Sequence, residues 1–98
     1  MRYIDDLIEE ISEELDGAAE YYEDSIIYKA KGNMTRASQY HDMAKQELNH
    51  AAILRDYAIQ DVDALKRVNG LSEEDHEHWE KCLHKLTERH SMLQHHLM

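Results

Sequence analysis

The chain has 98 residues, with 21 Asp and Glu against 11 Lys and Arg, and its formal net charge of −10 excludes binding to a polyanion such as nucleic acid. Its single cysteine excludes an internal disulfide and fits a reducing, cytoplasmic location. No apolar run reaches the ~18 residues of a membrane span, proline is absent and helix-favouring residues are frequent, so we expect one all-α domain over residues 1–98.

Residues 3–31 are predicted to form the first helix. Their apolar side chains recur at spacings of three and four, as on the buried face of an amphipathic helix. These are Ile4, Leu7, Ile8, Ile11, Leu15, Ala18, Tyr22 and Ile26. Gly32 and Asn33 then predict a tight joint, because glycine suits the left-handed position after a helix.

A second helix is predicted over residues 36–68, with Asn33 or Thr35 as its N-cap. Its inward stripe is expected to hold Ala37, Tyr40, Ala44, Glu47, Leu48, Ala51, Leu54, Ala58, Val62 and Leu65. Because the joint before it is short, the first two helices should form an antiparallel hairpin.

The end of the second helix is predicted at Asn69 and Gly70, and Ser72 followed by acidic residues predicts the start of a third helix. Its apolar stripe is Trp79, Cys82, Leu83, Leu86, Leu93 and Leu97. A hairpin with one further helix covers its apolar stripes poorly. We therefore expect two chains to dimerise into a four-helix bundle.

Glu47 and His50 are the residues most suggestive of chemistry. Glu and His at positions i and i+3 lie on one helical face, and this pair is a ligand unit of carboxylate-bridged di-iron sites in helix bundles. Here the pair interrupts the inward apolar stripe. A buried carboxylate without a partner is costly, so we expect a cation opposite it.

A glutamate of the first helix should complete this ligand set, and three candidates are available. Reflecting Glu47 through the joint favours Glu20, while facing direction favours Glu14, whose helical neighbours are mostly apolar. We prefer Glu14, with Glu20 and Glu23 as alternatives. The histidines of the third helix, including His76, His84, His95 and His96, are interpreted as solvated surface.

The spaced pattern from Gly32 through Ala37, Tyr40 and Ala44 to Glu47 and His50 resembles the second helix of rubrerythrin-type ferritin-like proteins. The resemblance covers about residues 11–54. Carried back without a gap, it places that family's first-helix glutamate on Glu14 and its tyrosine on Tyr21.

The half-length chain is also similar to the encapsulated ferritins, in which two subunits build one ferroxidase centre. The resemblance implies Glu14, Glu47 and His50 as metal ligands, and Tyr21 as a supporting group beside them. It further implies a di-iron centre at a subunit interface (with Zn or Mn as substitutes), Fe(II) oxidation by dioxygen or peroxide, assembly into rings and housing in an encapsulin shell. The competing hypothesis is a non-catalytic, self-associating helical interaction protein without a metal centre.

Overall fold

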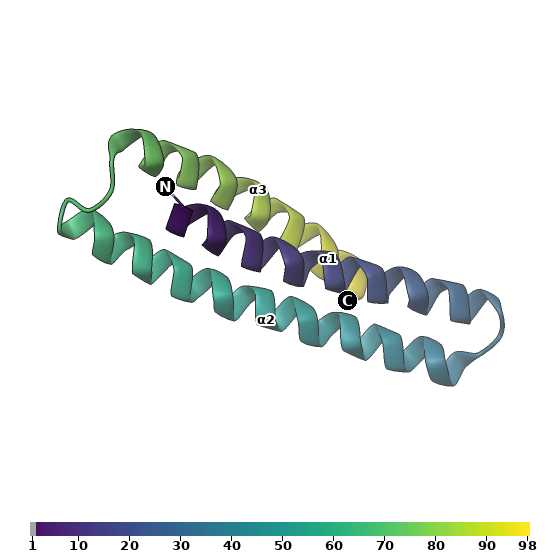
Figure 1. The fold of residues 1–98 in the computed structure, drawn as a ribbon. Helices are drawn as coiled ribbons and strands as arrows, with labels where there is room; N and C mark the ends of the chain where they lie inside the picture. Colours follow the sequence, from purple (N-terminus) through teal and green to yellow (C-terminus); the bar gives the residue numbers. More distant parts are fainter. Residues whose placement is uncertain (1) are drawn as a thin grey trace.

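The computed structural model describes residues 2–98, which form three α-helices and two short connections (Figure 1). The helices are α1 (Arg2–Ala30), α2 (Met34–Arg67) and α3 (Glu73–Leu97), and residues 2–98 contain no strand. The all-α prediction is confirmed, with helix ends within one or two residues of those expected. None of the three helices combines the length and the hydropathy that a membrane-crossing helix requires.

The joint between α1 and α2 is tight because the end of α1 is capped by its own backbone. Gly32 has a φ of +79°, its N–H donates to the carbonyl of Lys29, and the N–H of Asn33 donates to the carbonyl of Tyr28. This pair of hydrogen bonds is a Schellman motif. The Asn33 side chain then accepts from the N–H of Arg36 at 3.1 Å, so Asn33 rather than Thr35 caps α2.

The second joint repeats this chemistry with asparagine in the left-handed position. Asn69 has a φ of +54°, and the N–H of Gly70 donates to the carbonyl of Leu65 at 2.8 Å. The Ser72 hydroxyl accepts from the N–H of Asp75 at 3.1 Å and caps α3 as predicted. Both predicted joints are therefore confirmed.

The helices α1 and α2 run antiparallel along an elongated molecule of 55 × 21 × 17 Å. Small residues line much of their contact, so the two backbones approach closely. The buried core consists of Ile4, Ile11, Leu15 and Ala18 of α1, Ala44, Leu48, Ala51, Ala58 and Val62 of α2, and Trp79, Leu86 and Leu97 of α3.

The third helix packs along one side of the hairpin and covers only part of its length (Figure 1). His78 of α3 lies 3.0 Å from Asp5 of α1, and Arg89 forms an ion pair with Asp16. Near the end of α3, the His96 ring stacks on Tyr22 at a centroid distance of 5.7 Å. The end of the hairpin that carries the Gly32 turn extends beyond α3.

Ile26, which the spacing predicts on an inward face, is exposed, and Tyr57 of α2 is exposed as well. Ile26 is 49% exposed and Tyr57 is 61% exposed. Ile26 follows Tyr22 by one turn and so lies beyond the last turn of α3. Tyr57 belongs to the hairpin face that α3 leaves open. Pairing of two chains into a four-helix bundle stays a proposal.

Candidate metal centre

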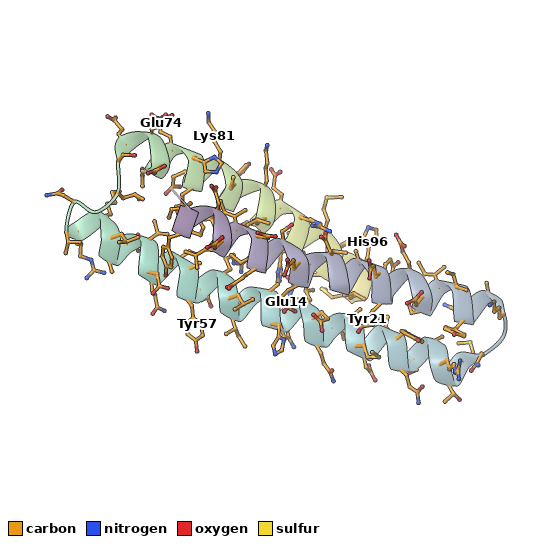
Figure 2. The ribbon with its side chains drawn as sticks, in the orientation of Figure 1. Glu14, Tyr21, Tyr57, Glu74, Lys81 and His96 are labelled. Atoms are coloured by element: carbon orange, nitrogen blue, oxygen red, sulfur yellow. The ribbon has the colours of Figure 1, made fainter. Side chains whose placement is uncertain are left out.

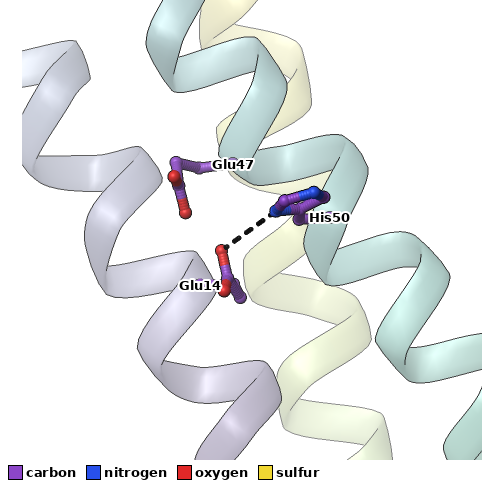
Figure 3. A group of neighbouring side chains, drawn as sticks. All are labelled: Glu14, Glu47 and His50. Carbon is purple, nitrogen blue, oxygen red and sulfur yellow. Dashed lines mark ion pairs between the residues drawn. The ribbon is translucent and has the colours of Figure 1, made fainter.

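Glu14 of α1, which is labelled in Figure 2, meets Glu47 and His50 of α2 between the two helices (Figure 3). Each side chain offers one ligand atom, and these three atoms lie within 4.8 Å of one another. Over residues 2–98, no other three His, Cys, Asp or Glu side chains converge in this way. The structure thus brings together the three residues predicted as ligands.

The close approach of α1 and α2 explains why these side chains meet. Ala18 of α1 and Ala44 and Ala51 of α2 are fully buried at this level. Alanine side chains let two helices pack with little distance between their backbones. Glu14 lies one turn before Ala18, while Glu47 lies one turn after Ala44.

The Glu14 carboxylate has one buried oxygen. Its Oε2 atom is buried and has no hydrogen-bond partner. The basic group that faces it is the His50 ring, whose Nδ1 lies 3.8 Å from this oxygen (Figure 3). That separation is too long for a hydrogen bond. A buried carboxylate oxygen therefore lacks a donor or a bound cation.

The pKa of Glu47 also reflects the lack of positive charge in the cluster. Its pKa is raised above the ordinary value of 4.5, first because a protonated Glu47 can hydrogen-bond to Glu14, and then because of burial and the charge of Glu14. His50 acts in the opposite direction but less strongly. The cluster therefore holds excess negative charge, which favours binding a proton or a metal cation.

Sequence reasoning missed Gly17 of α1. A Cβ atom built on Gly17 would lie 3.4 Å from Oε2 of Glu47 and 3.7 Å from its Cδ. The Glu47 side chain therefore rests against the α1 backbone at a position without a side chain. The available signal was a glycine in a helix interior, one turn after Glu14, where alanine would favour the helix more.

The cluster lies on the side of the hairpin away from α3. Asp16 contacts α3, and Glu14 is about 200° from Asp16 around α1 at ~100° per residue. Figure 3 shows the ribbon of α3 passing behind the two helices that carry the cluster. His50 is correspondingly open, with 69% of its side chain exposed against 29% for Glu14.

The remaining candidates lie elsewhere. Glu20 and Glu23 are exposed and take no part in the cluster. Tyr21 is half-buried, and its ring lies 6.0 Å from that of Tyr40, which stacks on Tyr28 at 5.3 Å. A supporting role of Tyr21 toward the metal ligands stays a prediction.

The chain matches no protein-family model, no curated protein and no solved structure. The resemblance to ferritin-like proteins therefore rests on the spaced motif alone.

Proposed function

We propose that the protein is a ferritin-like iron protein that binds Fe(II) at Glu14, Glu47 and His50 and oxidises it with dioxygen or peroxide. The observation that carries this proposal is the convergence of two carboxylates and one imidazole. One carboxylate oxygen, Oε2 of Glu14, is buried without a hydrogen-bond donor. Carboxylate and imidazole ligands suit iron, with zinc and manganese as substitutes.

The distance between two of the ligand atoms is compatible with a metal ion bound between them. Metal–nitrogen and metal–oxygen bonds of about 2.1 Å together span up to ~4.2 Å. The 3.8 Å between Nδ1 of His50 and Oε2 of Glu14 lies within that span. Small side-chain movements would allow Glu47 to supply the third ligand. A divalent cation here would neutralise both carboxylates at once.

Three ligands leave coordination positions open, and a second copy of the chain is the partner we propose for this face. The cluster lies near the middle of the hairpin: Glu14 is residue 13 of 29 in α1, and His50 is residue 17 of 34 in α2. A two-fold axis at this level would overlap two hairpins along their length and bring two clusters together. Exposed Met43, Ile53 and Tyr57 of α2 supply apolar surface for this contact.

In this proposal the protein residues bind and orient the Fe(II) substrate. Two Fe(II) ions together release the two electrons that convert one peroxide and two protons into two waters, so a paired site matches the electron count. The anionic charge of Glu14 and Glu47 favours Fe(III) over Fe(II).

The test is an anaerobic Fe(II) titration followed by addition of peroxide. We expect about two ions per dimer, as in a paired carboxylate site. The Glu47→Ala, His50→Ala double variant should lose Fe(II) oxidation while its dimerisation, measured by analytical ultracentrifugation, is largely retained. The matched control removes His84 and Glu88, an exposed pair 2.9 Å apart on α3. Unchanged oxidation in the first variant would refute the proposal.

The exposed apolar side chains of α2 also favour the alternative, a self-associating interaction protein without a metal centre. That alternative predicts dimers that bind no Fe(II), Mn(II) or Zn(II). Residence in the cytoplasm stays a prediction from the single cysteine, and association with an encapsulin shell stays a prediction of the family resemblance.

A further inference from the structure

Gly17 stands in the middle of α1, where glycine is the least favourable residue apart from proline. The chain has three glycines, and Gly32 alone among them has a positive φ. Gly17 thus has ordinary helical backbone angles, which alanine adopts more readily. Backbone flexibility therefore does not account for a glycine at position 17. The absence of a side chain there must have another physical reason.

The Glu47 side chain occupies the space beside Gly17. The three atoms nearest to a Cβ at this position are Oε2, Cδ and Cγ of Glu47, at 3.4, 3.7 and 3.8 Å. Gly17 follows Glu14 by three residues, so both face the same groove. Figure 3 shows the Glu47 carboxylate leaning toward α1 rather than toward the His50 ring.

We infer that Gly17 is a positioning residue, which keeps open a place on α1 for the Glu47 carboxylate beside Glu14 and leaves this carboxylate free to turn toward His50 when a divalent cation binds. The second half of this inference rests on the proposed function. A carboxylate against bare backbone can change its rotamer without meeting a side chain. A methyl group on residue 17 would contact Oε2, and a larger side chain would take the space of the carboxylate.

Two substitutions separate this role from a purely structural one. Gly17→Ala fits at ordinary contact distance and should raise the Tm of the metal-free protein by about 2–8 °C through helix propensity. It should nevertheless weaken Fe(II) binding several-fold, measured by anaerobic titration calorimetry. Gly17→Leu should fold and bind Fe(II) at least tenfold more weakly. Ala30→Leu, at an exposed position of the same helix, is the control that should leave affinity unchanged.

Wild-type affinity in Gly17→Leu would overturn the inference, because a structural role alone changes stability and leaves binding intact. The packing of the Glu47 side chain against Gly17 is tested in the metal-free protein by the nuclear Overhauser contact between Gly17 Hα and Glu47 Hγ. Its presence in the wild type, and displacement of Glu47 in Gly17→Leu, support the inference, while its absence in the wild type overturns it. A wild-type protein that shows this contact but binds neither Fe(II) nor Mn(II) would instead refute the proposed function and the metal-dependent half of the inference.

Discussion

Nδ1 of His50 faces the Glu14 carboxylate oxygen that lacks a hydrogen-bond donor, across 3.8 Å and between two different helices. The relationship joins an exposed imidazole to a buried anion. The distance between the two atoms exceeds hydrogen-bond length, so the imidazole leaves this carboxylate oxygen without a donor. Several consequences for stability and binding can be measured directly.

Metal binding should stabilise the fold. A ligand that binds only the folded state at about 100 times its Kd adds ~2.7 kcal/mol to the free energy of unfolding. In a domain of this size that corresponds to a Tm rise of about 10 °C or more. We expect this rise with anaerobic Fe(II) or Mn(II), its reversal by a chelator, and its loss in Glu14→Ala. An equal rise in the Glu14 variant would place the bound ion elsewhere.

The metal-free protein should lose stability as pH rises through the titration of Glu47. The pKa of Glu47 is raised in the folded state, so the folded chain holds this proton more tightly than the unfolded chain. The resulting stabilisation is fully present below the ordinary pKa of 4.5 and disappears as pH passes the raised value. Glu47→Gln should remove this dependence and raise the Tm near neutral pH.

The measurement compares thermal unfolding of the two proteins with chelator present, from about pH 4 to pH 7, so that the many other carboxylates cancel in the difference. Glu20→Gln, at an exposed position, is the control and should follow the wild type. A constant difference in Tm between Glu47→Gln and the wild type at every pH would contradict the expectation.

The alanine contact between α1 and α2 should tolerate no added volume. Ala51 is fully buried beside the cluster, so Ala51→Leu overpacks the helix contact and should cost about 1–3 kcal/mol. Ala64→Leu places the same side chain at an exposed position of α2 and should be nearly neutral. Urea denaturation followed by circular dichroism measures both. Equal stabilities would mean that the helices separate easily at this level.

Docking of α3 should depend on Trp79. This residue is the sole tryptophan of the chain and is 2% exposed, so its fluorescence reports the environment of α3. Trp79→Ala should destabilise the fold by about 3–5 kcal/mol through lost burial and a cavity. Asp16→Ala, which removes the exposed ion pair with Arg89, should cost at most ~1 kcal/mol. The reverse order would mean that charge rather than burial holds α3.

Much of the fold could be predicted because its signals are local. Gly32 with Asn33 and Asn69 with Gly70 mark helix ends through backbone chemistry, and Ser72 marks a helix start. Glu14 is preferred to Glu20 because its apolar helical neighbours predict that its side chain faces the second helix. The position of Glu47 relative to the Gly32 joint would favour Glu20 instead. Facing direction was the better guide because a site between helices requires both side chains in one groove.

Other features depend on how the helices pack against one another, which the spacing of residues within one helix does not predict. The exposure of Ile26 follows from the place where α3 ends, and no periodicity in α1 records that place. His50 was expected within the inward stripe, yet it lies at the rim because α1 and α2 form only two sides of the groove. The contact between Gly17 and Glu47 joins two helices and becomes visible only when their backbones are placed.

The short reach of α3 divides the hairpin into two regions of unequal protection. At one end, α3 packs against the hairpin of α1 and α2. Around the Gly32 turn, α1 and α2 pack only against each other. Local opening is easier where fewer apolar contacts must break. Amide protons between about residue 24 and residue 44 should therefore exchange with deuterium before those of the end that packs against α3, so that the molecule unravels from its turn inward.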